Sequence, residues 1–401
     1  MTLSKVSCLM LFGFSLAPGQ LLMRPSRPGE PIRLLPSDAA ILEGRQPRTD
    51  LPCEVKPTSP TLEYDLSYHA GYQITIPFQA LAGSGDTLTS ILQVTPEGRE
   101  DSVYFSQKWT VPPIEDSVRG DVSMQGTIVL GEGIYQIAWL MRDRAEHFCA
   151  SFWQVSTLRR GKDRDVTLHA APGTVGPLTK DLFREEGRVQ RNGERPLTVQ
   201  VLLHATSQSV GAAAMGPAET EAIVAILRHI AREPRFARFS ITVFNIDRRA
   251  VIFREKDADG IPFPALGTAL KDLHLGTMPI QALADKQGGT RFLTNLLTEE
   301  MDGQKPDLLL IVGPRSEPDE SSVRGFLKQL PDPACPVFYL NYSLDAQTNP
   351  WRDLLSSVVR FWHGIEYTIC TPRDLFLAWS GVMSRFAPKP AKDSRSTTAS
   401  R

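Results

Sequence analysis

The sequence predicts two domains of different class, an all-β sandwich followed by a doubly wound α/β domain. The chain has 401 residues, which is room for two or three domains of roughly 100–200 residues each. Short runs of alternating apolar and polar residues follow one another from about residue 61 to residue 158, as is typical of a sandwich. From Leu197 onward, apolar runs alternate with helix-like stretches, which predicts a parallel-rich sheet covered by helices on both faces.

The composition is that of a globular protein. Hydrophobic residues make up 41% and charged residues 22% of the chain, which argues against global disorder, a collagen-like repeat or a polytopic membrane protein. Lys and Arg number 44 against 45 Asp and Glu, a formal net charge of -1. Because there is no basic excess, a nucleic-acid partner is not expected.

Residues 1–20 have the layout of a secretory signal peptide. Lys5 precedes an apolar run from Val6 to Ala17, and Pro18-Gly19 ends it. The run is shorter than the roughly 20 residues that a membrane-spanning helix needs. We therefore expect export to the periplasm, the envelope or the medium, with no stable membrane span after cleavage. A retained anchor and a buried N-terminal segment are the alternatives.

Residues 21–60 are rich in proline and predict an extended linker or arm. In the β domain, 61–158, strand-like runs are separated by turn residues such as those at 83–86 and 96–98. Four aromatic residues in this region could stack on a carbohydrate, but packing in the core is the commoner use of such side chains: Trp109, Tyr135, Trp139 and Trp153.

Residues 159–196 carry mixed charges and predict a solvated linker. The α/β domain is expected over 197–387. Its clearest helix spans 218–232, where Ala222, Ile223, Ile226 and Ile230 fall on one face. The tail, 388–401, has nothing to bury and should be disordered.

Three loops of the second domain carry a family resemblance. The strand Val199–Leu203 is followed by Ala205-Thr-Ser-Gln-Ser209, Gly288-Gly-Thr290 opens a helix, and Gly313-Pro314 follows another strand. In this order the region resembles a von Willebrand factor type A (vWA) domain, in the version attached to small β-domains in exported bacterial proteins. The resemblance covers about residues 195–387 and rests on landmarks rather than on identity.

The resemblance implies a degenerate metal-ion-dependent adhesion site. The family holds Mg²⁺ or Mn²⁺ with two Ser, one Thr and two Asp; Ser207, Ser209 and Thr290 match the hydroxyl positions, whereas Ala205 and Gly313 replace the carboxylates. Neutral hydroxyls alone cannot replace the water of a strongly hydrated cation. We therefore expect no tight metal site and no cofactor, unless a nearby carboxylate restores a weak site for Mg²⁺ or Mn²⁺. Restoring both carboxylates, with Ala205→Asp and Gly313→Asp, is predicted to raise Mg²⁺ affinity.

Removal of the signal would leave Cys53, Cys149, Cys335 and Cys370, and an even number suits an oxidising compartment. None belongs to a CxxC pair, so a zinc site has no support. If disulfides form, we expect Cys53–Cys149, because Cys53 lies on an arm that can reach the β domain. In the sheet that the resemblance implies, the start of one strand and the end of its parallel neighbour hold Cys335 and Cys370 too far apart to bridge.

Motifs of other chemistry are missing from the sequence. It contains no GxSxG elbow, P-loop or HExxH. His204 could be imagined as a base beside Ser207, but no third orienting group is identifiable. Asp257 and Asp259 predict a solvated turn rather than a calcium loop.

We therefore expect a non-catalytic, exported protein–protein interaction module of the adhesion or scaffold type, whose partner is an unknown protein. Fold-level analogy supplies much of this expectation. Two alternatives stay open: a hydrolase-type enzyme with a site dispersed in sequence, and an adhesion protein that retains Mg²⁺ dependence. A deep pocket with a perturbed His or carboxylate would favour the enzyme.

Overall fold

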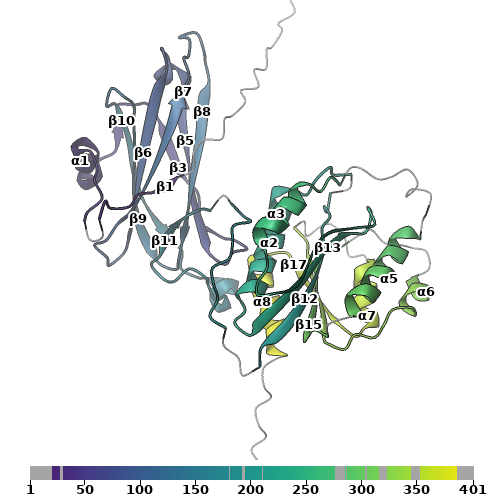
Figure 1. Ribbon diagram of the computed structural model, residues 1–401. Helices are drawn as coiled ribbons and strands as arrows, with labels where there is room; N and C mark the ends of the chain where they lie inside the picture. The colour runs from purple at the N-terminus through teal and green to yellow at the C-terminus, as the bar shows by residue number, and fades with distance from the viewer. Residues whose placement is uncertain are drawn as a thin grey trace, which may run out of the picture. The chain divides into compact units, whose positions relative to one another are not determined.

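The computed structural model describes residues 20–27, 30–179, 181–191, 195–209, 211–275, 285, 287–302, 305–315, 323–344 and 353–385. The chain divides into two compact units, Met1–Lys180 and Asp181–Arg401, and each is described by itself (Figure 1). The expected signal peptide, apart from Gln20, and the expected disordered tail lie outside the described residues.

The first unit contains two antiparallel sheets. The first sheet has the order β1-β7-β6-β9-β10-β2, and the second has the order β11-β8-β5-β3, with β4 also paired to β5. The strands of the first sheet are β1 (Leu21–Leu22), β2 (Arg48–Thr49), β6 (Asp86–Pro96), β7 (Val103–Val111), β9 (Ile134–Arg142) and β10 (Phe148–Ser156). Those of the second sheet are β3 (Glu54–Pro57), β4 (Thr61–Leu62), β5 (Tyr68–Pro77), β8 (Asp121–Leu130) and β11 (Val175–Pro177).

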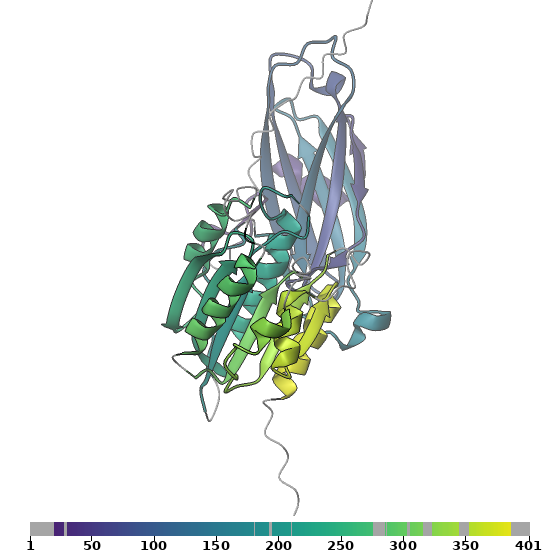
Figure 2. The same cartoon turned by 90° about the vertical axis from the view of Figure 1, so that its right-hand side faces the viewer.

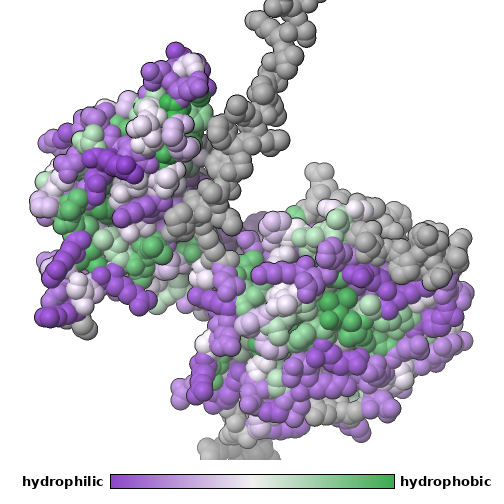
Figure 3. Space-filling model, turned by 45° about the horizontal axis from the view of Figure 1, so that its top comes forward, coloured by the Kyte–Doolittle hydropathy of each residue, from purple (hydrophilic) through white to green (hydrophobic). Residues whose placement is uncertain are grey.

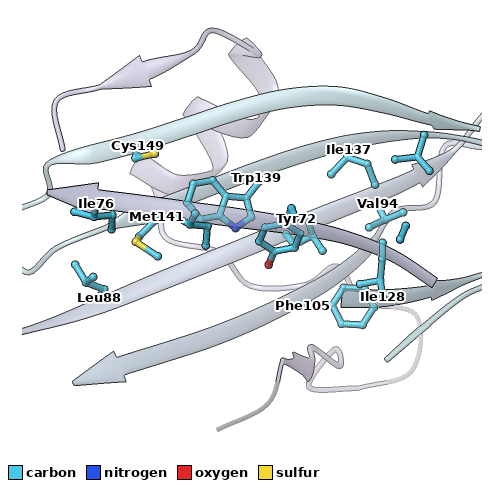
Figure 4. Close-up of a cluster of buried hydrophobic side chains, with 14 of the residues drawn as sticks. Tyr72, Ile76, Leu88, Val94, Phe105, Ile128, Ile137, Trp139, Met141 and Cys149 are labelled. Atoms are coloured by element: carbon cyan, nitrogen blue, oxygen red, sulfur yellow. The ribbon is translucent and has the colours of Figure 1, made fainter. Parts of the chain in front are cut away.

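The core of this unit follows from the two-residue period of its strands. Along β5, buried residues alternate with more exposed ones, so one face of the strand packs inward. Inward side chains from both sheets form one cluster, in which Tyr72, Trp139 and Met141 lie together (Figure 4). The sandwich character of this unit is confirmed.

The four aromatic residues singled out in the sequence belong to this core. Tyr135 and Trp139 are fully buried, and Trp109 and Trp153 are partly buried against the same cluster. Tyr72 makes tilted ring contacts with both Trp139 and Trp153. These side chains therefore pack the sandwich and do not form an exposed platform for a ligand.

The segment 21–60 is not a free linker but part of the first unit. It supplies β1, β2 and β3 and the helix α1 (Pro36–Gly44), and Figure 1 shows α1 against the outside of the first sheet. Proline at the first turn of a helix, as at Pro36, and at the end of an edge strand, as at Pro57, is compatible with regular structure. The expected linker 159–196 likewise supplies β11, which pairs with β8.

The second unit contains the third sheet, with the order β14-β13-β12-β15-β16-β17. Its neighbouring strands are parallel except for β13 and β14, which are antiparallel. The strands are β12 (Leu197–His204), β13 (Phe236–Asn245), β14 (Ala250–Ala258), β15 (Leu308–Gly313), β16 (Val337–Tyr342) and β17 (Ile365–Ile369).

Helices lie against this sheet, with α2, α3 and α8 on one side and α5, α6 and α7 on the other (Figures 1 and 2). Leucines of α5 and α7 pack with apolar residues of β12, β15 and β16 in one buried cluster. The helices are α2 (Pro217–Arg232), α3 (Phe263–Lys271), α5 (Gly288–Met301), α6 (Val323–Leu327), α7 (Leu354–Phe361) and α8 (Pro372–Ser384).

The predicted fold class was wrong. The chain is β-rich, with three sheets, and helices make up about 25% of it. The third sheet is mixed, because residues 250–258, expected to end in a solvated turn, form a strand antiparallel to β13. The described residues form a β-sandwich unit followed by a unit with a mixed sheet, which differs from the doubly wound vWA-like class that the sequence predicts.

Within the described part of the chain, no helix combines the length and the apolar composition needed to cross a membrane. Hydrophilic residues cover much of the visible surface of each unit, and smaller hydrophobic areas lie among these hydrophilic residues (Figure 3).

Candidate functional site

The candidate residues gather around one edge of the third sheet. β12, β13, β15 and β16 are parallel, so their carboxyl ends meet at the same edge, which is where open sheets of this kind present their loops. Ala205, Ser207 and Ser209 directly follow β12, and Gly313 ends β15.

Ala205 and Gly313 occupy backbone positions with little free space. Ala205 is fully buried, its amide donates to the carbonyl of Phe244 at 2.9 Å, and its carbonyl accepts from Asn245 Nδ2 at 2.8 Å. Gly313 has a φ of +148°, and a Cβ built there would lie 2.6 Å from the carbonyl oxygen of His204. The carboxylate that the vWA resemblance calls for at Gly313 therefore cannot be introduced without moving β12 or β15. Because of this contact, we expect Gly313→Asp to disturb the pairing of β12 and β15 rather than to raise Mg²⁺ affinity.

The hydroxyl of Ser207 is engaged within its own loop. Ser207 Oγ donates to Glu219 Oε1 at 3.1 Å and accepts from the amide of Ser209 at 3.1 Å. The same carboxylate accepts from the amide of Gln208, and its other oxygen accepts from the amide of Gly216 at 2.6 Å. Glu219, on the first turn of α2 and only 7% exposed, thus fixes the loop 207–216 onto the helix as in a capping box.

Gln208 ties this loop to the chain that follows β16. Its Nε2 donates to the carbonyl of Tyr342 at 2.9 Å, and its Oε1 accepts from the amide of Leu344 at 3.0 Å. The hydroxyl of Tyr342 lies 3.4 Å from the carbonyl of Thr206. Burial, with a smaller contribution from Glu219, raises the pKa of Tyr342 well above its ordinary value, so the phenol stays protonated and can donate.

Thr290 is buried on the first turn of α5. Gly289 beside it faces Ile246, which places this helix start next to the end of β13. Glu317 and Asp319, the carboxylates that follow Gly313 in the sequence, lie outside the described residues. Among the residues that the structure describes, no three His, Cys, Asp or Glu side chains lie close enough together to hold a metal ion. With Ser207 and Glu219 bonded to each other and no carboxylate at 205 or 313, the donors here do not fit Mg²⁺.

His204 is a buried structural residue. It stacks on Phe244 with ring centroids 5.3 Å apart, and its Nε2 lies 3.4 Å from the amide of Ile246, which donates to it. Burial lowers the pKa of His204 to about 4, although the charge of Asp247 and a backbone hydrogen bond with Pro314 act in the opposite direction. Since the ring is fully buried, His204 has no access to a substrate as a general base.

Glu219, Gln208 and Asn245 are the residues of this site that sequence reasoning missed. Glu219 lies within the predicted helix 218–232, and its place three residues after Gly216 is a capping signal. Gln208 and Asn245 act on backbone groups that are distant in sequence, and no local pattern announces such contacts.

The four cysteines in the described part of the chain comprise one disulfide pair and two residues outside any disulfide. Cys53 and Cys149 form a disulfide with a Cα–Cα distance of 6.1 Å, within the range that such a bond tolerates. Cys335 and Cys370 are not disulfide-bonded, and burial raises the pKa of Cys335 to about 11. The disulfide joins the proline-rich arm to β10, next to the short pairing of β10 with β2.

Comparisons with known proteins do not place the chain in a family. No family model matches it, and no curated protein matches it. Among solved structures, proximal thread matrix protein 1 from the mussel byssus is 9% identical, covers 48% of this chain and 46% of its own, and has a TM-score of 0.29. The chain thus spans about half the length of that protein. A β-glucuronidase from Bacteroides uniformis is 12% identical, over 77% of this chain and 38% of its own, with a TM-score of 0.19. A β-glucosidase from Listeria innocua is 10% identical, over 26% and 16%, with a TM-score of 0.17. Similarity at this level supports no conclusion about function.

Proposed function

We propose that the protein is an exported, non-catalytic binding module that contacts another protein through the loops at the carboxyl edge of the third sheet. The observation that carries this proposal is the use of the polar side chains there. Glu219, Gln208 and Asn245 bind backbone groups of the same loops and so hold the loop 205–209 in one shape. A preformed loop loses little conformational entropy on binding, which favours its use as a contact surface.

The chemistry of the candidate residues supports binding over catalysis. His204 is buried and neutral at physiological pH, and Ser207 donates to the carboxylate of Glu219, which also accepts from two backbone amides of the loop. A nucleophile needs a base within reach that can accept its proton and pass it on. Glu219 instead accepts hydrogen bonds from backbone amides and caps the start of α2.

The Cys53–Cys149 disulfide supports export. Such bonds persist in oxidising compartments and are rare in the cytosol. Together with the signal-like residues 1–20, it makes the periplasm, the envelope or the medium the proposed location.

Site-specific crosslinking in the native cell tests the binding surface. A photoreactive amino acid is placed at Ser209, which is exposed on the proposed surface, and at Ala334, which is exposed before β16 and hence at the opposite edge of the sheet. We expect a crosslinked protein adduct of one defined mass from position 209 and none from 334. Adducts from 334 alone, or from neither position, would contradict the proposal.

A substitution at Glu219 tests whether crosslinking at position 209 depends on the shape of the loop. Glu219→Gln replaces one acceptor oxygen by an amide that cannot accept from the loop amides, so the loop should loosen and the adduct from position 209 should decrease. Glu221→Gln, two residues further along the exposed side of α2, is the matched control and should leave the adduct unchanged.

A further inference from the structure

A cavity of about 320 Å³ lies in the first unit, between α1 and the outer face of the first sheet. Five uncharged polar side chains from β6, β7 and β9 and from the residue before β7 form its floor: Gln93, Thr95, Ser102, Tyr104 and Gln136. The volume falls within the usual range for small-molecule sites.

The cavity exists because α1 covers only part of the sheet. Ile91, Ala138 and Leu140 form the apolar area under the helix, together with Leu42 of α1. The helix is held there by Asp38, which is buried and lies 2.9 Å from Arg142 Nε. Because side chains two residues apart share a face of a strand, the outer face continues along the strands with polar residues beyond the edge of α1.

Strand register brings these polar residues together. Gln93 is paired with Tyr104 on one side and with Ala138 on the other, and Thr95 is paired with Gln136. Neighbours paired in this way are about 4.5–5.5 Å apart at Cβ. The floor is therefore a continuous patch and not a set of scattered side chains.

The hydrogen bonds of the floor leave groups free for a ligand. Gln93 Nε2 donates to Ser102 Oγ at 3.0 Å and to Tyr104 OH at 3.1 Å, and Ser102 and Thr95 share a hydrogen bond of 2.7 Å. Since the amide protons of Gln93 are used in this way, the side-chain oxygen of Gln93 and the hydroxyl proton of Tyr104 remain available. Gln136 adds an amide that can both donate and accept.

We propose that this cavity binds an uncharged, hydroxyl-rich ligand, namely a mono- or disaccharide. A sugar hydroxyl both donates and accepts, which matches a floor of amides and hydroxyls, and the C–H faces of the ring match the apolar wall made by Leu34 and Leu42. The floor carries no charged side chain, and the two charged residues that line the cavity, Glu43 of α1 and Arg45 at its end, are exposed and opposite in sign, so the lining favours neither an anion nor a cation. The proposal is independent of the loops of the second unit.

Binding measurements with the full mature chain test this proposal. The probes are three uncharged disaccharides: cellobiose, maltose and N,N′-diacetylchitobiose. Glucuronic acid is the charged ligand for comparison. Saturation-transfer NMR detects weak binding and titration calorimetry ranks it. We expect at least one disaccharide to bind and to be preferred over glucuronic acid. If none of the three binds, or if glucuronic acid binds as well, the proposal is overturned.

Variants locate the binding. Tyr104→Phe and Gln136→Leu should each weaken the sugar by roughly fivefold or more, the loss expected for one hydrogen bond. Gln73→Leu, an exposed residue of the second sheet that bonds Ser123, is the control and should bind as the native chain does. Thermal unfolding verifies that each variant is folded. Equal binding by folded Tyr104→Phe and Gln136→Leu would overturn the site, and this outcome does not affect crosslinking at Ser209.

Discussion

The carboxylate of Glu219 fixes the conformation of the loop that follows β12. Its two oxygens accept from the Ser207 hydroxyl and from the amides of Gln208 and Gly216. A carboxylate that is only 7% exposed needs such partners, since a buried charge without them is strongly unfavourable. The polar residues after β12 are therefore explained by loop structure before any ligand is considered.

His204 provides a pH-dependent prediction at the same scale. Its folded pKa of about 4 lies below the ordinary value of 6.5, so between these values the unfolded chain binds a proton that the folded chain excludes. Stability should therefore fall as the pH is lowered from about 6.5 to about 4, by roughly 3 kcal/mol for this residue. Imidazole NMR should find His204 neutral at pH 5, whereas His147, whose pKa Asp143 raises, should be protonated. A protonated His204 in the folded chain at pH 5 would contradict the burial.

Gly313 provides the second residue-scale prediction. At its φ of +148°, and with a Cβ position 2.6 Å from the carbonyl oxygen of His204, even Gly313→Ala should destabilise the second unit by about 2–4 kcal/mol. Chemical denaturation measures the change. Gly260→Ala is the control, because no atom lies within 4 Å of its Cβ position; equal stability of the two variants would show that β12 and β15 can adjust.

At the scale of elements, the sequence predicts strands and helices better than it predicts which segments are linkers without packing contacts. The alternation in β5 and the apolar face of α2 were visible because each element has its own period. The prolines of 21–60 instead predicted a free arm, although β2 and β3 pair at sheet edges, where a missing amide is tolerated. β14 was missed because its second half is charged and exposed, as edge strands often are.

The disulfide gives an element-scale prediction. Cys53 and Cys149 are 96 residues apart, and a crosslink over a loop of that length is expected to contribute about 4–5 kcal/mol. Cys53→Ser should lower the unfolding free energy of the first unit by about this amount, measured by denaturation without reductant. Cys335→Ser, at a free thiol of the second unit, should not. If peptide mapping finds Cys53 and Cys149 unlinked in the exported protein, that result would contradict both the predicted stabilisation by the disulfide and the proposed oxidising compartment.

The segment 181–191 is a second element whose sequence predicted only a linker. Glu186 forms ion pairs with Arg228 and Arg232 of α2, and Phe183 packs against Gly267 of α3. Burial raises the pKa of Glu186, but its hydrogen bonds with Arg232 and Arg228 outweigh burial and lower the pKa overall. The contribution of the pairs should therefore be lost as the pH falls through that lowered pKa.

We expect Glu186→Gln to release this segment from α2. Amide hydrogen exchange and limited proteolysis within 181–191 should both increase, because the segment then loses two charge-assisted contacts. Glu185→Gln changes the exposed neighbouring carboxylate and serves as the control. Unchanged exchange in Glu186→Gln would mean that Phe183 and the backbone contacts hold the segment without the ion pairs.

At the scale of the whole molecule, the change of pattern along the sequence predicts a sandwich followed by a doubly wound domain, and only the sandwich character is confirmed. The sandwich followed from evenly spaced short strands, because each strand reports its own inward face. The class of the second unit depended on how its strands pair, and the antiparallel β13–β14 hairpin was not predicted because much of β14 is charged and exposed. The loop 205–209 follows β12 and Gly313 ends β15, whereas Gln208 shapes its loop through Tyr342, which is 134 positions away in the sequence.

The two units should also unfold separately. Each has its own buried cluster, one centred on Tyr72 and Trp139 and the other on leucines of α5 and α7 with strands of the third sheet, and a unit with its own core can fold alone. Because the disulfide lies entirely in the first unit, a reductant should lower the melting temperature of one transition in calorimetry and leave the other in place. Gly313→Ala should shift only the second transition. A single transition that moves as a whole under both treatments would show that the units fold as one cooperative body.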